Sequence, residues 1–83
     1  MQICVIDGQG GGIGSLIIRK LRDTFDASID ITALGTNAIA TAQMLKARAN
    51  RGASGENAIV RTVQGMDIVI GPIDFGDDRL QHR

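Results

Sequence analysis

The stretch QICVIDGQGGGIGS, residues 2–15, decides the fold of this chain. It opens with a short apolar run, ends that run at Asp7, and then places five glycines within residues 8–14. Apolar residues at helical spacing follow from Ile13. The order strand, glycine-rich turn, helix brings free backbone N–H groups and the positive end of a helix dipole to one place, which attracts phosphate. We therefore expect an anion site at this turn.

Strands and helices are expected to alternate along the rest of the chain. After the first strand, residues 2–7, we expect a helix over 13–25, a half-covered strand near a sheet edge over 28–35, a helix over 38–49, a loop over 52–56 and a strand over 66–71. Residues 58–63 fit a short strand and a helical turn equally well. This alternation predicts an α/β fold: a small Rossmann-like open parallel sheet, strand order 2-1-3, with helices on both faces.

Ligands of such sheets bind at the carboxyl ends of the strands, where neighbouring connections leave in opposite directions. The exits of the first and third expected strands meet there, beside the exit of the second. The candidate site residues are Asp7, Gly8, Gly10, Gly11, Gly12, Gly14, Ser15, Thr36, Asn37 and Gly71. We expect them to bind a small phosphate-bearing molecule, with NAD(P) or another nucleotide as the cofactor class.

Known phosphate-loop spacings narrow this expectation. A P-loop requires a lysine that is absent after Gly14, and G-x-G-x-x-G fails at its third glycine. Gly8, Gly12 and Gly14 do fit G-x-x-x-G-x-G, which resembles the cofactor loop of short-chain dehydrogenases. Those enzymes carry a catalytic tyrosine downstream of the loop. This chain has no tyrosine, so a dehydrogenase of that type is excluded. No nucleophile–base pair is visible, and the sequence favours binding over catalysis.

Each candidate residue also has a purely structural interpretation. Asp7 either accepts N–H bonds from the glycine turn, which we prefer, or holds Mg²⁺ that bridges to phosphate. Thr36 and Asn37 either cap the next helix or bind a ribose or phosphate. Ser15 is either an ordinary first-turn residue or a phosphate contact. The glycines themselves can form a tight turn that has no ligand.

Composition limits the other function classes. The 83 residues allow one small domain with zero net charge and two aromatic residues, which disfavours nucleic-acid binding. Lys46, Arg48 and Arg51 form the one dense basic patch, which we interpret as a solvated helix face. No apolar run reaches membrane-spanning length, and the single Cys4 lies in an apolar strand, so a cytoplasmic protein is expected. A homo-oligomeric assembly module is the alternative function.

The segments VIDGQGGGIG, ALGTNAIATAQMLKARAN, GASGENAIV and MDIVIGPI resemble an uncharacterised bacterial family, domain of unknown function 3842. The resemblance implies a Rossmann-like domain over residues 1–73 and no assigned activity. Residues 74–83 are polar, include the sole histidine, His82, and are expected to be a tail where the chain is truncated or divergent. The family's characteristic positions are Asp7, Gly8, Gly10, Gly11, Gly12, Gly14, Thr36, Asn37, Gly55, Glu56, Asn57, Gly71 and Pro72.

Overall fold

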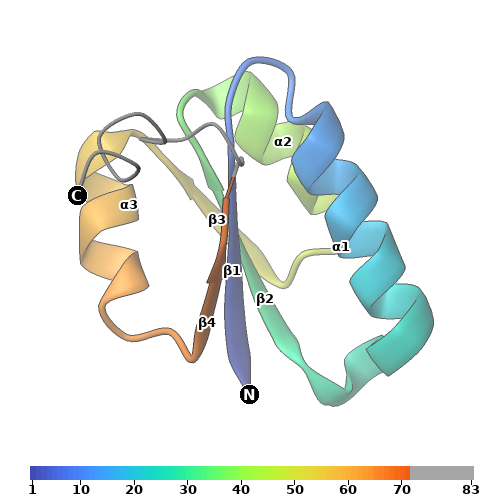
Figure 1. Cartoon of the computed structure of the whole chain (residues 1–83). Coiled ribbons are helices and arrows are strands. Elements are labelled where there is room, and N and C mark those ends of the chain that lie inside the picture. Colours follow the sequence, from blue (N-terminus) through green and yellow to red (C-terminus); the bar gives the residue numbers. More distant parts are fainter. Residues whose placement is uncertain (72–83) are drawn as a thin grey trace, which may run out of the picture.

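The computed structural model describes residues 1–71 and shows alternating strands and helices (Figure 1). The expected tail, residues 74–83, lies outside this described part. The elements are β1 (Gln2–Asp7), α1 (Gly12–Phe25), a 3₁₀ turn (Asp26–Ser28), β2 (Asp30–Gly35), α2 (Ala38–Lys46), β3 (Arg51–Ser54), α3 (Glu56–Val63) and β4 (Ile68–Ile70).

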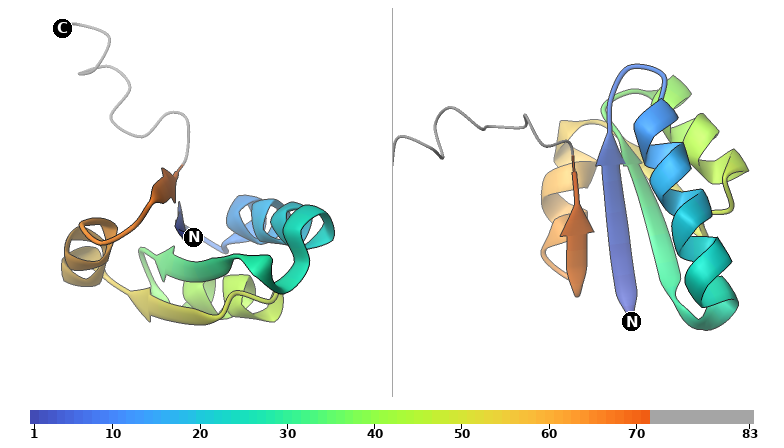
Figure 2. Two further views of the ribbon diagram at one scale, coloured as in Figure 1. Left: turned by 90° about the horizontal axis from the view of Figure 1, so that it is seen from below. Right: turned by 45° about the vertical axis from the view of Figure 1, so that its right-hand side comes forward.

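The strands form one parallel sheet in the order β3-β2-β1-β4. Helices α1 and α2 cover one face, and α3 covers the other (Figures 1 and 2). The predicted α/β fold with helices on both faces is therefore confirmed. The three strands expected from the sequence keep their 2-1-3 order as β2-β1-β4, and a fourth strand lies outside β2.

That fourth strand, β3, corrects the prediction of a loop over residues 52–56. Its sequence, RGAS, has no apolar alternation, so nothing local indicates a strand. Pairing with β2 extends it, in the register Thr32↔Arg51 to Gly35↔Ser54. The expectation that the strand over residues 28–35 is half-covered is also wrong, because β2 lies between β1 and β3 and residues 31–35 are buried.

Two helical boundaries also differ from the prediction. Helix α2 ends at Lys46 rather than near Ala49, because Arg48 adopts a left-handed backbone conformation, φ 82°, that turns the chain toward β3. The undecided residues 58–63 are helical and belong to α3. The final strand is shorter than residues 66–71 and spans only Ile68–Ile70.

Strand β1 is apolar on both faces because it lies between two helical layers. Ile3 and Val5 point into the main core under α1 and α2, together with Ile18, Ile31 and Met44. Cys4 and Ile6 pack on the other face with Leu34, beneath partly buried side chains of α3. Among residues 1–71, no helix combines the length and apolar character that crossing a membrane requires.

Candidate functional site

The carboxyl edge of the sheet brings most of the candidate residues together. Strand register aligns Asp7 with Gly35, and Gly35 with Ser54. The amide of Thr36 donates to the carbonyl of Asp7 at 3.0 Å, which joins the exits of β1 and β2. Gly71 follows β4 beside Ile6, on the opposite side of β1. The order β3-β2-β1-β4 matches the first four strands of the 3-2-1-4-5-6 doubly wound sheet.

The turn after β1 is compact and begins α1 directly. The amide of Gly11 donates to the carbonyl of Gly8 at 2.9 Å, and Gly11 caps the helix with φ 74°. A Cβ on Gly11 would lie 2.6 Å from the carbonyl oxygen of Ala40 in α2. A Cβ on Gly14 would lie 2.5 Å from Met44 Sδ and 2.9 Å from Asp7 Cβ. These two glycines are therefore explained by internal packing.

Asp7 forms hydrogen bonds to the amides of Gly8 and Gly14, and we call this the lower side of the turn. Its carboxylate accepts from the amide of Gly8 at 2.8 Å through Oδ1 and from the amide of Gly14 at 2.6 Å through Oδ2. The residue is 8% exposed. The preferred interpretation of Asp7, as an acceptor of N–H bonds from the glycine turn, is confirmed. Within residues 1–71, no three His, Cys, Asp or Glu residues gather as a metal-binding group.

The upper side of the turn, formed by Gly10, Gly12 and Ile13, is exposed. Gly10 and Gly12 are exposed, and a Cβ on either would meet no atom within 4 Å. Neither has a positive φ, so nothing in the described fold requires glycine at these positions. No oxygen in residues 1–71 accepts a hydrogen bond from the amides of Gly10, Gly12 or Ile13. Three backbone donors are thus open to solvent at the positive end of the α1 dipole.

The remaining candidate residues are placed as follows. Ser15 is buried, and its hydroxyl donates to the carbonyl of Gly11 at 2.7 Å, inside the helix. Asn37 caps α2, because its Oδ1 accepts from the amide of Ala40 at 2.8 Å. Thr36 is exposed, and its Oγ1 would lie 3.1 Å from a Cβ on Gly8. Of these three side chains, only that of Thr36 is exposed and has no internal hydrogen bond among residues 1–71.

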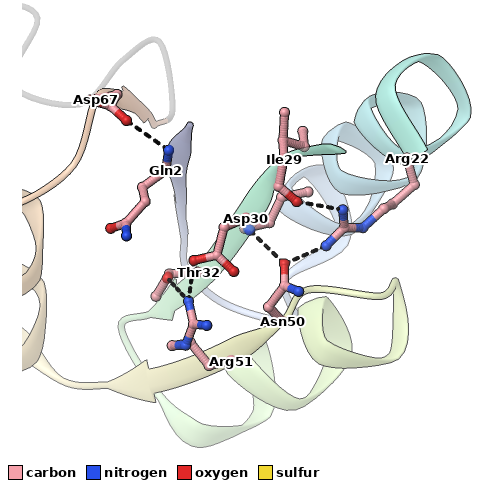
Figure 3. Close-up of polar contacts among 9 residues, drawn as sticks. Gln2, Arg22, Ile29, Asp30, Thr32, Asn50, Arg51 and Asp67 are labelled. Carbon is pink, nitrogen blue, oxygen red and sulfur yellow. Dashed lines mark hydrogen bonds and ion pairs between the residues drawn. The ribbon is translucent and has the colours of Figure 1, made fainter. Parts of the chain in front are cut away.

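A second polar cluster, which the sequence did not reveal, lies at the opposite edge of the sheet (Figure 3). Arg22 leaves the buried face of α1 and donates to the carbonyls of Arg48, Asp26 and Ile29 at 2.8, 2.7 and 3.0 Å. Its Nη2 donates to Asn50 Oδ1, which also accepts from the amide of Ile31. This guanidinium joins the end of α1, the start of β2 and the chain entering β3. Its role is structural.

Lys46, Arg48 and Arg51 are exposed as expected, but they do not share one helix, because α2 ends at Lys46. Arg51 belongs to β3 and pairs with Asp30 of β2, while Arg48 lies 3.8 Å from the exposed carboxylate of Asp23. The hydrogen bond from Arg51 lowers the pKa of Asp30 from its ordinary value. Burial raises the pKa of the Cys4 thiol, which therefore stays protonated at neutral pH.

Comparison with known proteins identifies the family. A family model described as "Domain of unknown function (DUF3842)" matches residues 2–76, so the chain belongs to that family. No curated protein and no solved structure matches the chain. The family carries no assigned activity.

Proposed function

We propose that this protein binds a phosphate-bearing ligand, a nucleotide or dinucleotide such as NAD(P), at the turn between β1 and α1. The observation that carries the proposal is the open upper side of the turn at Gly10 and Gly12. Glycine costs conformational entropy, and these two positions have no internal reason for it. A phosphate approaching the bare backbone is a sufficient reason, because any side chain there would stand in its way.

The strand order supports the same location. In doubly wound sheets the ligand lies outside the carboxyl ends of the strands, at the point where the strand order reverses. Here β2 and β3 lie on one side of β1, and β4, which follows α3 on the other face of the sheet, lies on the other side of β1, so the order reverses between β1 and β4 (Figure 1). The turn therefore lies at the position that this rule assigns to a ligand. We assign no reaction to the site.

The charge around the turn sets the expected strength of binding. Residues 8–18 contain no lysine or arginine, and the Asp7 carboxylate lies beneath the turn. Binding therefore relies on backbone N–H donors and the helix dipole, which supply roughly half an elementary charge. We expect affinities in the range of about 10 µM to 1 mM.

Isothermal titration calorimetry with NAD, NADP, ATP and inorganic phosphate tests the proposal. Gly10→Val and Gly12→Val place side chains in the open space and are expected to abolish binding. Gly65→Val is the matched control, because a Cβ there also meets nothing within 4 Å but the residue lies just before β4, away from the carboxyl edge. If none of the four ligands binds, or if the Gly10 and Gly12 variants bind like the control, the proposal is wrong.

A second candidate function, assembly with another copy of this chain, is favoured by strand β4. Within residues 1–71, β4 pairs only with β1, and Ile68 and Val69 are 40% and 47% exposed. The other sheet edge, β3, has the polar sequence RGAS and begins with a charged residue, which discourages pairing. We propose that two copies pair through β4. We also propose that the protein works in the cytoplasm.

Sedimentation velocity over a range of concentrations tests the assembly. The native chain is expected to form a dimer whose fraction rises with concentration. Val69→Lys at the β4 edge is expected to shift it to monomer, while Arg51→Lys at the β3 edge leaves the dimer fraction unchanged. A native chain that stays monomeric at the highest concentration excludes this function.

A further inference from the structure

The end of β2 lies beside the glycine turn and presents Thr36 to solvent. The Thr36 amide is hydrogen-bonded to the carbonyl of Asp7, and its hydroxyl lies next to the position of Gly8. No hydrogen bond from the Thr36 side chain is formed within residues 1–71, and the residue is exposed. On the β2 side of the turn, the Thr36 hydroxyl is therefore an exposed side-chain group without an internal partner among the described residues.

Thr36 follows the second strand, at the position that contacts the ribose in dinucleotide-binding sheets of this order. In sheets that begin with the strand order 3-2-1-4, an acidic residue about 20 residues after the glycine turn accepts a hydrogen bond from the ribose 2′-hydroxyl of NAD. Where the ligand carries a 2′-phosphate instead, a nearby arginine accommodates it. These two charges separate NAD from NADP, because a carboxylate repels the 2′-phosphate and a guanidinium attracts it.

This chain has neither charge at that position. Thr36 is neutral, and the Asn37 Oδ1 is occupied by the amide of Ala40. Residues 31–45 contain no lysine, arginine, aspartate or glutamate. Within residues 1–71, Asp7 is buried with both carboxylate oxygens hydrogen-bonded, and Glu56 starts α3 on the other face of the sheet.

We infer that Thr36 sets the ribose selectivity of the site and makes it tolerant, so that a ribose 2′-hydroxyl and a 2′-phosphate are accepted with similar affinity. This inference rests on the proposed function. The threonine hydroxyl is both a donor and an acceptor, so it satisfies either group without a charge penalty. The ligand class is thus an adenosine dinucleotide, and the site has no charged side chain at Thr36 to distinguish a 2′-hydroxyl from a 2′-phosphate.

The test is calorimetric titration of NAD and NADP, separately, into the full chain and into Thr36→Asp. The native chain is expected to bind the two with dissociation constants within about threefold of each other. Thr36→Asp is expected to weaken NADP by about tenfold while NAD binding is retained, because the new carboxylate repels the 2′-phosphate. Thr24→Asp, an exposed position at the far end of α1, is the control and should leave the ratio unchanged.

The outcomes separate the two claims. A native chain that binds one dinucleotide more than about tenfold better than the other overturns the inference and leaves the proposed function intact. An unchanged NADP-to-NAD ratio in Thr36→Asp also overturns it, because Thr36 then does not face the ribose. If neither dinucleotide binds and phosphate or ATP does, the inference fails alone. If no phosphate compound binds, both claims fail.

Discussion

The carboxylate of Asp7 holds the backbone amide of Gly14, with 2.6 Å between Oδ2 and the nitrogen. This contact divides the glycine turn into two sides. The lower side is closed, because Asp7 also takes the amide of Gly8 and because Gly14 packs against Met44. The upper side, at Gly10 and Gly12, stays open. The turn is therefore hydrogen-bonded and packed on one side, while the amides of Gly10 and Gly12 have no acceptor among residues 1–71.

Replacing Asp7 with alanine is expected to destabilise the protein by about 2–3 kcal/mol. The change leaves the buried amide of Gly14 without an acceptor and removes two charge-assisted hydrogen bonds. Urea unfolding measures the effect. Asp67→Ala is the control, since Asp67 also accepts a backbone amide, that of Gln2 at 2.8 Å, but is exposed and should cost less than about 1 kcal/mol. Equal losses in the two variants would contradict the closed lower side.

Gly14→Ala and Gly12→Ala are expected to change stability in opposite directions. Alanine at position 14 meets Met44 and Asp7, and overpacking of this kind costs about 1–3 kcal/mol. Alanine at position 12 meets nothing and gains up to about 1 kcal/mol from its better helix propensity. Thermal unfolding should show a lower midpoint for Gly14→Ala and an equal or higher one for Gly12→Ala. A lower midpoint for both would mean that position 12 is internally constrained.

Arg22→Ala is expected to cost about 3 kcal/mol or more, which is a large part of the stability of so small a domain. Three carbonyl oxygens and Asn50 Oδ1 lose their donor together. Arg22→Lys should recover only a small part, because an ammonium cannot reproduce the planar fork. Arg19→Ala, an exposed position on the same helix, serves as the control in denaturant unfolding. Near-native stability of Arg22→Ala would refute the structural role.

The Asp30–Arg51 pair is expected to give a small pH-dependent stabilisation. Because the hydrogen bond from Arg51 lowers the pKa of Asp30, the contribution is complete above the ordinary aspartate pKa, about 3.9. It is lost as the pH falls through the lowered pKa. The difference in unfolding free energy between the native chain and Asp30→Asn should therefore be constant near neutral pH and shrink as the pH falls below about 3.9. The difference should also shrink in high salt. A difference that grows on acidification would contradict the pair.

How far the sequence predicted this structure depended on whether the signal was local. The order apolar run, glycines, helical spacing over residues 2–25 predicted β1, the turn and α1, and it also predicted that Asp7 would accept N–H bonds from the turn. Strand β3 was missed because RGAS becomes a strand only by pairing with β2. Strand β2 is buried between its two neighbours, whereas the alternation of residues 28–35 had predicted a half-covered strand.

The contacts of Arg22 were beyond any pattern in the sequence. Its partners come from three separate segments: Asp26 at the end of α1, Ile29 just before β2, and the loop before β3. Only the folded chain brings those segments together. In the candidate site, the sequence located the turn but could not separate the closed glycines from the open ones. That separation depends on which neighbours a Cβ would meet, and α2 supplies most of them at Gly11 and Gly14.

The most direct test of the central claim is an amide ¹H–¹⁵N titration of the native protein with inorganic pyrophosphate and with NAD. We expect saturable shifts at the amides of Gly10, Gly12 and Ile13. Shifts should be smaller at Gly8 and Gly14, because their N–H groups already donate to Asp7, and absent at Gly65. Unchanged amides at residues 10, 12 and 13 with both compounds, at concentrations up to about 10 mM, would contradict it.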